Sequence, residues 1–170
     1  DLAKLDFHGA LTRIKACFGA LPPQAESPLS NHVTLPVYYG DEAALDIQAV
    51  ASALSLSVDH IIRLHSQTTY RVHALGFAPG FAYMASTPVE LSMPRLATPR
   101  TCVPEGAVAI ADRQTAVYPQ SSPGGWHILG RCPLAMFTKN RQPASLLSRG
   151  DSVTFNPISR DEFIALGGEL

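Results

Sequence analysis

Apolar residues recur at roughly helical spacing in several parts of this chain. The spacing over residues 1–18 predicts a first helix. Three prolines within residues 19–32 interrupt the pattern and indicate a linker. Helical spacing returns over residues 45–54 and again after Ser57, a residue type that favours the N-cap of a helix. A last helix is predicted over residues 159–166, where Ser-x-x-Glu forms a capping box.

A different pattern separates these helices. β-Branched and aromatic residues predict strands over 33–39 and 68–77, and Pro36 puts the first of them at an edge or a bulge. Further along, short apolar segments alternate with Gly and Pro, and the segments that read as strands are 107–111, 115–119, 126–130, 134–137 and 151–157. Short strands at close spacing favour a barrel or a sandwich. We therefore expect a mainly β domain over about residues 33–158.

The composition fits one folded domain and argues against two classes of partner. Of the 170 residues, 46% are hydrophobic and 16% are charged, which is enough apolar material for a core. The formal net charge is −1 and no two Lys or Arg residues are adjacent, so we expect no nucleic-acid partner. No apolar stretch approaches the roughly 20 residues that span a bilayer, so we expect no membrane partner. The opening residues also lack the basic-then-apolar order of a signal peptide.

The cysteines and histidines indicate neither a disulfide framework nor a metal site. The three cysteines are odd in number, widely spaced and without a Cys-x-x-Cys motif, which favours reduced thiols in a cytoplasmic protein. None of the six histidines pairs with a Cys or another His at ligand spacing. The sequence also contains no P-loop, no Gly-x-Ser-x-Gly elbow and no His-Glu-x-x-His motif.

The stretch GFAPGFAYM, residues 76–84, gathers aromatic side chains around a Pro-Gly pair. One interpretation is an aromatic turn that seals one end of a barrel. The other is a pocket wall, in which Phe77 and Phe81 supply an apolar face and Gly80 lets a ligand approach the backbone. The sequence leaves both open.

Pro-Arg occurs twice within residues 93–106, at Arg95 and at Arg100. Each proline stiffens the chain beside its arginine. A guanidinium fork binds a carboxylate or a phosphate through two hydrogen bonds, so the pair is a candidate anion site. The alternative is two solvated surface arginines.

A third candidate region begins with Gln114 and Tyr118, which lie four residues apart on an expected strand and therefore share a face. There they either orient a polar substrate or simply face outward. The turn Pro-Gly-Gly-Trp, residues 123–126, puts two flexible residues before the chain's single tryptophan. It indicates either a tight turn that leads into a strand or a backbone that approaches another molecule.

His65 falls at the end of a predicted helix, in the stretch RLHS. A histidine in that position interacts favourably with the helix C-terminus as a cation, or is a partly buried hydrogen-bonding residue. The functional alternative is a general acid or base.

Taken together, GFAPGFAYM, PRLATPRTCVPEG and QTAVYPQSSPGGWHILGRCPLAMF resemble, in this order, the central block of the KipI-like family. Its members are also called allophanate hydrolase subunit 1 or the B-type subunit of 5-oxoprolinase. The resemblance covers about residues 33–158 and implies a cyclophilin-like closed β-barrel domain over 33–170, with a few inserted helices and one terminal helix. Residues 1–32 look like the last helix of a preceding α/β lobe and a Pro-rich linker, so we expect a truncated chain.

The resemblance also implies a function. Such a subunit works with a KipA-like and a LamB-like subunit as an ATP-dependent 5-oxoprolinase, which opens the pyroglutamate ring to give glutamate, and we expect it to be inactive alone. One alternative is a carboxyltransferase-type subunit that acts on urea-like amides with biotin carried elsewhere. Another is a non-catalytic inhibitor of a histidine kinase.

Matched onto this sequence, the resemblance implies a set of site residues and no metal. The catalytic candidates are His65, Arg100 and Gln114. The candidates for binding substrate are Phe77, Pro79, Gly80, Phe81, Arg95, Tyr118, Pro123, Gly124, Gly125 and Trp126. The sequence departs from the family pattern at positions that favour glycine, which here hold Ala85, Ser86, Ala109, Asp112, Arg113 and Ala116. These departures bear on the substrate rather than on the fold.

Overall fold

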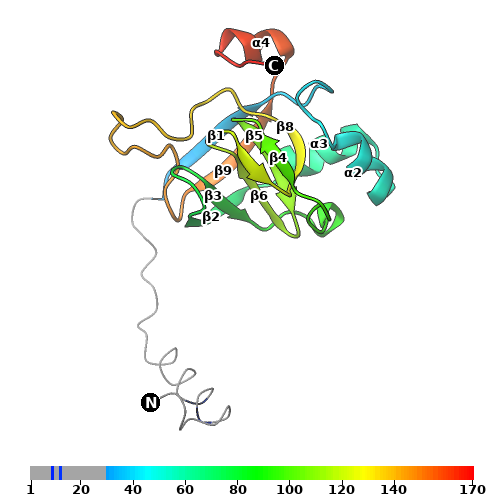
Figure 1. Ribbon diagram of the computed structural model, residues 1–170, viewed down its shortest axis with the longest axis horizontal. Coiled ribbons are helices and arrows are strands. Elements are labelled where there is room, and N and C mark those ends of the chain that lie inside the picture. Colours follow the sequence, from blue (N-terminus) through cyan, green and yellow to red (C-terminus); the bar gives the residue numbers. More distant parts are fainter. Residues whose placement is uncertain (1–8, 10–11, 13–29) are drawn as a thin grey trace.

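A seven-stranded sheet dominates the protein (Figure 1). The computed structural model describes Gly9, Thr12 and residues 30–170. Within this part, the strand order in the sheet is β1-β9-β2-β3-β6-β5-β8. The strand bounds are β1 His32–Val37, β2 Tyr70–Leu75, β3 Ala82–Ala85, β5 Ala107–Ala111, β6 Gln114–Val117, β8 His127–Arg131 and β9 Ser152–Pro157. A separate two-stranded ribbon pairs β4, Arg100–Val103, with β7, Ser122–Gly124.

The sheet closes into a barrel because its two outer strands meet. Tyr38, directly after β1, and Arg131, the last residue of β8, exchange backbone hydrogen bonds of 2.9 and 2.8 Å. Strand β1 runs parallel to β9, and its other side makes only this contact at Tyr38 within the described residues. Pro36 therefore lies on an outer strand, as its missing amide requires. The mainly β barrel implied by the family resemblance is confirmed.

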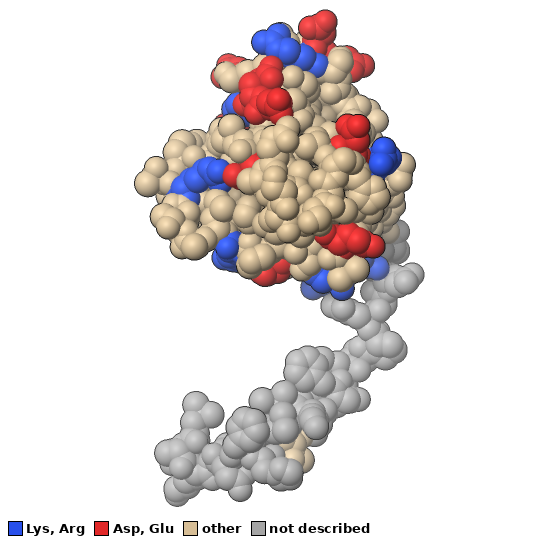
Figure 2. Space-filling view, turned by 90° about the vertical axis from the view of Figure 1, so that its right-hand side faces the viewer, with Lys and Arg blue, Asp and Glu red and all other residues tan. Residues whose placement is uncertain are grey.

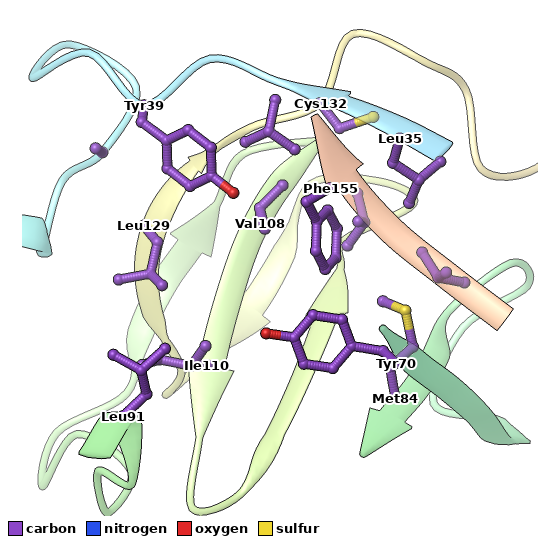
Figure 3. Close-up of a cluster of buried hydrophobic side chains, with 14 of the residues drawn as sticks. Leu35, Tyr39, Tyr70, Met84, Leu91, Val108, Ile110, Leu129, Cys132 and Phe155 are labelled. Carbon is purple, nitrogen blue, oxygen red and sulfur yellow. The ribbon is translucent and has the colours of Figure 1, made fainter. Parts of the chain in front are cut away.

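Strand β5 is buried on both faces and separates two apolar clusters. Val108 and Ile110 face the barrel interior, which also holds Phe155 (Figure 3). The alternate alanines of β5 face the ribbon β4–β7 instead. Ala109 and Ala116, two of the departures from the family's glycine pattern, are fully buried in this second cluster. Their methyl groups pack in this cluster with the aromatic side chains of Phe81, Tyr118 and Trp126.

Three α-helices and one short 3₁₀ helix lie outside the sheet over residues 30–170, with α2 and α3 together on one side of the barrel (Figure 1). They are α2 Ile47–Leu54, α3 Val58–Ser66, η2 Val89–Leu91 and α4 Arg160–Ala165. Helices α2 and α3 lie beside the barrel and bury their apolar side chains in its interior cluster. The predicted N-cap at Ser57 is confirmed, since its hydroxyl accepts a hydrogen bond from the His60 amide. The capping box at the start of α4 is confirmed as well.

Some of the strands differ from the sequence predictions. The predicted strand over 134–137 is wrong, because there Phe137 makes only an isolated bridge with Ser145 in the loop between β8 and β9. The short strands β3, β4 and β7 were not predicted. The expected helix over 1–18 and the linker over 19–32 lie almost entirely outside the described residues.

The distribution of surface charge and the lengths of the helices bear on nucleic-acid and membrane partners. On the face that Figure 2 shows, charged residues are scattered among wide uncharged areas, and the described residues there form no continuous basic track. Among the described helices, none alone is long and apolar enough to cross a membrane, although α2 and α3, bent by 99°, meet that test of length and composition as a pair.

Candidate functional site

A small pocket lies on the side of the barrel wall that faces the ribbon β4–β7. Its volume is about 80 Å³, which is room for a small molecule only. The lining residues are Phe77, Phe81, Tyr83, Arg95, Tyr118, Pro123, Gly124, Gly125 and Trp126. Eight of these nine were candidates for binding substrate, and Tyr83 was missed.

Phe81 is the centre of the aromatic wall. Its ring centroid lies 4.8 Å from that of Tyr83, 5.3 Å from Tyr118 and 5.8 Å from Trp126. Phe77 is a fourth neighbour of Phe81, with its ring centroid at 5.2 Å. Tilted and edge-on contacts of this kind are favourable because the positive edge of one ring meets the negative face of the next. The wall is therefore a rigid packed cluster rather than a set of separate surface rings.

The first of the two adjacent glycines serves this cluster directly. A Cβ atom on Gly124 would collide with the Tyr118 hydroxyl oxygen, so the absence of a side chain lets the turn pass over the phenol. A Cβ atom on Gly125 would meet only ordinary contacts, the nearest at 3.6 Å from Pro99. The turn therefore approaches the pocket wall, and only Gly124 is required by space.

Arg95 supplies the positive charge of the pocket. Its Cζ atom lies 5.9 Å from the centroid of the Trp126 ring, in reach of a cation–π contact. Its side chain is exposed, and no carboxylate in the described part of the chain forms an ion pair with it. Burial raises the pKa of Tyr118, and the Arg95 charge acts in the opposite direction. At neutral pH the pocket thus offers a guanidinium and a protonated phenol, both hydrogen-bond donors for an anion.

The second arginine has a different environment. Arg100 forms an ion pair with Asp46 at 2.5 Å and does not line the pocket. The other oxygen of the Asp46 carboxylate accepts a 2.7 Å hydrogen bond from the Ile128 amide. Arg100 therefore joins the ribbon to the chain before α2, and its place as a substrate-contacting catalyst is not supported.

His65 belongs to the barrel interior rather than to the pocket. Its side chain is fully buried, Nδ1 lies 2.7 Å from the Tyr39 hydroxyl and Nε2 lies 2.9 Å from the Thr115 hydroxyl. Thr115 donates its single hydroxyl proton to the Ala109 carbonyl, so its oxygen accepts from the Nε2–H of His65. Nδ1 is then left to accept from Tyr39, whose hydroxyl points into the interior in Figure 3.

This environment determines the charge of His65. Burial lowers the pKa of its imidazole from 6.5 to about 3, so the ring is neutral with both nitrogens paired. A ring in that state has neither a free proton nor a free lone pair to offer a ligand. His65 therefore lies in the core of the barrel and does not line this pocket.

The remaining candidates also lie outside the pocket lining. Gln114 is half-buried on the same side of β6 as Tyr118 but does not reach the pocket. Pro79 is exposed. Gly80 has a φ of +83°, and a Cβ atom there would come to 2.8 Å from the Cβ of Phe137, so this glycine serves loop packing. The three catalytic candidates, His65, Arg100 and Gln114, are not brought together.

Comparisons with known proteins agree with the fold. A family model described as "carboxyltransferase domain, subdomain C and D" matches residues 1–147. The chain is 39% identical over 151 residues to the B-type 5-oxoprolinase subunit of Haemophilus influenzae and 42% identical over 133 residues to that of Bacillus subtilis. These matches cover 89% and 78% of this chain, and 70% and 55% of the two relatives. The chain therefore spans little more than half the length of the second relative.

A solved structure is similar over nearly the whole chain. It is that of a conserved uncharacterized protein from Pyrococcus horikoshii, with a TM-score of 0.75 and 39% sequence identity. The match covers 96% of this chain and 74% of the other.

Proposed function

This chain belongs to the carboxyltransferase-domain family, subdomains C and D, and on this premise we propose that it works as a subunit of an ATP-dependent 5-oxoprolinase. The relatives at about 40% identity are named as B-type subunits of 5-oxoprolinase, and a subunit name implies a complex of several chains. We propose a KipA-like and a LamB-like chain as the partners, and the cytoplasm, where ATP is present, as the location.

The observation that carries the proposal is the unpaired Arg95 at the mouth of an aromatic pocket. 5-Oxoproline is a flat five-membered lactam with one carboxylate. Arg95 would bind that carboxylate, and the Phe81 cluster would pack against the ring. The Tyr118 hydroxyl would add a hydrogen bond from the side of the barrel. A pocket of this small size and single positive charge suits such a substrate.

The reaction needs an activated amide. Lactam resonance makes the ring carbonyl a poor electrophile, and ATP supplies activation by transferring its terminal phosphoryl group to the carbonyl oxygen. Attack by one water and cleavage of the ring C–N bond would leave an acyl phosphate of glutamate. Attack by a second water would then release inorganic phosphate, so that the products are glutamate, ADP and inorganic phosphate. The residues of this chain would bind and orient the lactam. Because a nucleotide triphosphate carries several negative charges and the pocket has one arginine, the pocket does not fit ATP, and we propose that ATP binds elsewhere in the complex.

The test is ATP-dependent release of glutamate from 5-oxoproline by this chain assembled with its KipA-like and LamB-like partners. Arg95→Gln removes the charge but keeps much of the side chain. We expect KM for 5-oxoproline to rise about 10- to 100-fold, as for loss of a charge-assisted hydrogen bond. Arg149→Gln, at an exposed arginine outside the pocket lining, is the matched control and should leave KM unchanged. An intact assembly that releases no glutamate would contradict the proposal.

The description of the family favours one second candidate, carboxyl transfer to a urea-like amide with biotin carried by another chain. The aromatic walls would suit a flat ureido group, but an uncharged urea gives Arg95 no partner. The same assembly, supplied with carboxybiotin and urea in place of ATP and 5-oxoproline, distinguishes the two candidates. Turnover of urea that is insensitive to Arg95→Gln would favour the transferase. If both reactions fail, binding to a histidine kinase is the alternative to measure next.

A further inference from the structure

We infer that His127 is a positioning residue, which holds the backbone carbonyl of Pro94 and thereby fixes Arg95 over Trp126 as the anion-binding group of the pocket. The inference rests on the proposed function only for the nature of the ligand, a small carboxylate. The positioning itself is a property of the free chain.

The register of two segments places Arg95 opposite Trp126. The imidazole Nε2 of His127 lies 2.8 Å from the Pro94 carbonyl oxygen. Two residues along, the Leu96 amide donates a 2.8 Å hydrogen bond to the Gly125 carbonyl. Pro94 is thus hydrogen-bonded to His127, and Leu96 to Gly125. Arg95 lies between Pro94 and Leu96, so it faces Trp126, which lies between Gly125 and His127. This is how the guanidinium comes to lie over the indole ring.

The bond from His127 reaches the Pro94 carbonyl from a side chain rather than from a backbone amide. Proline has no amide hydrogen, so a sheet-like ladder is interrupted at Pro94. A carbonyl oxygen only accepts, which means that Nε2 of His127 carries the proton. The side chain of His127 is 7% exposed, and its Nδ1 atom is buried without a partner within the described residues. The contact with Pro94 is therefore the single hydrogen bond that the described part of the chain gives this buried ring.

The far end of the same segment is held separately. Arg100 pairs with Asp46, and the Asp46 carboxylate also binds the Ile128 amide, next to His127 on β8. The segment 94–100 is thus attached to the start of β8 at both ends. Pro94 is attached directly, through His127, and Arg100 indirectly, through Asp46. Two contacts flank Arg95, one from Pro94 to His127 and one from Leu96 to Gly125. Only the contact at His127 is made by a side chain, so it is the one that a substitution can remove.

A role in packing alone makes a different prediction from a role in positioning. In His127→Gln, the side-chain amide nitrogen takes nearly the place of Nε2 and can still donate to Pro94. In His127→Asn, the amide nitrogen takes the place of Nδ1 and is too short to reach it. Packing alone predicts that both variants disturb the site, whereas positioning predicts that Gln rescues and Asn does not.

The experiment needs no ligand, because the chain has one tryptophan and therefore one indole N–H signal in a ¹⁵N–¹H spectrum. Arg95→Gln should move this signal by removing the cation from the Trp126 ring. We expect His127→Asn to move it in the same direction and by a similar amount, and His127→Gln to leave it near its original place. In the Arg95→Gln background, His127→Asn should add little further change. Thermal unfolding of each variant checks that it is folded.

Three results would overturn the inference. The first is a Trp126 indole signal that moves in Arg95→Gln but not in His127→Asn. The second is a Trp126 indole signal that moves equally in His127→Gln and His127→Asn. The third needs no variant: an imidazole ¹⁵N spectrum of the unaltered chain that shows the proton on Nδ1 rather than on Nε2. In the assembled complex, His127→Asn should raise KM for 5-oxoproline about as much as Arg95→Gln. An assembly without activity would contradict the proposed function and leave the indole result to decide the inference.

Discussion

His65 and Arg95 lie on opposite sides of the same barrel wall and differ in how much of their hydrogen-bonding capacity the fold uses. The imidazole of His65 is fully buried, neutral and paired at both nitrogens. The guanidinium of Arg95 is exposed, charged and stacked on one ring, with no carboxylate partner in the described part of the chain. Hydrogen-bonding capacity that the fold leaves unused is what a ligand can take up. The unused hydrogen-bonding capacity therefore lies on the pocket side of the wall, at Arg95.

The largest expected difference between the two sides is in stability. Phe155 is 2% exposed and stacks on His65 at 4.4 Å, whereas Phe77 at the pocket rim is 63% exposed. Phe155→Ala should lower the free energy of unfolding by about 3–5 kcal/mol, because it leaves a cavity in a packed core. Phe77→Ala should lower it by less than about 1 kcal/mol. Urea unfolding of the two variants measures both values, and equal losses would contradict the division into core and rim.

The two glycines of the turn sharpen the comparison within the pocket itself. Gly124→Ala should lower the free energy of unfolding by about 1–3 kcal/mol, since the new methyl group collides with the Tyr118 hydroxyl. Gly125→Ala, its neighbour, should change it by about 0.5 kcal/mol or less. Adding Tyr118→Phe to Gly124→Ala should restore part of the loss, because the nearest clashing atom is removed. Thermal or urea unfolding gives the values, and a loss at Gly125 as large as at Gly124 would refute the assignment.

The pH dependence of stability tests the neutral state of His65. The unfolded chain binds a proton at this group near pH 6.5, but the folded chain does so only near pH 3, because burial lowers the pKa. Stability from this group is therefore complete above pH 6.5 and falls as the pH drops below it, by about 1.4 kcal/mol for each pH unit. His65→Leu should lower stability at pH 7, since it leaves the Tyr39 hydroxyl without its acceptor, and should remove this slope between pH 6.5 and 5. An unchanged slope would mean that the fold does not lower the pKa of His65.

Local signals in the sequence were sufficient for some elements. Ser57 and the Ser-x-x-Glu box indicate helix starts because a cap is formed by residues three apart in the chain. The barrel followed from several long motifs in a fixed order. The segment 134–137 misled because four apolar residues look the same in a strand and in a loop that packs on a core. Strands β4 and β7 were missed because three or four residues carry little periodicity, and β7 also contains Pro and Gly.

The site was predictable in its walls but not in its chemistry. Aromatic residues and glycines of the motifs do line the pocket, and Tyr83 could have been added because it is an aromatic residue of the same motif as Phe77 and Phe81. Arg95 and Arg100 follow prolines in the same way, so the sequence offers no way to separate them. What separates them is Asp46, which lies 54 positions from Arg100 in the chain. For His65, helical spacing indicates a buried face. It does not reveal that the hydroxyl groups of Tyr39 and Thr115, from other parts of the chain, lie beside the ring.

The parallel pairing of β1 with β9 has a consequence for the order of folding during synthesis. Residues 32–37 lie beside residues 152–157, so the first strand of the barrel has no sheet partner along its length until the last strand has left the ribosome. Contacts this far apart in sequence form slowly, and an unpaired strand edge is prone to associate with other chains. The nascent chain therefore carries an open β-edge while the residues between β1 and β9 are made, and the barrel closes only after β9 has emerged.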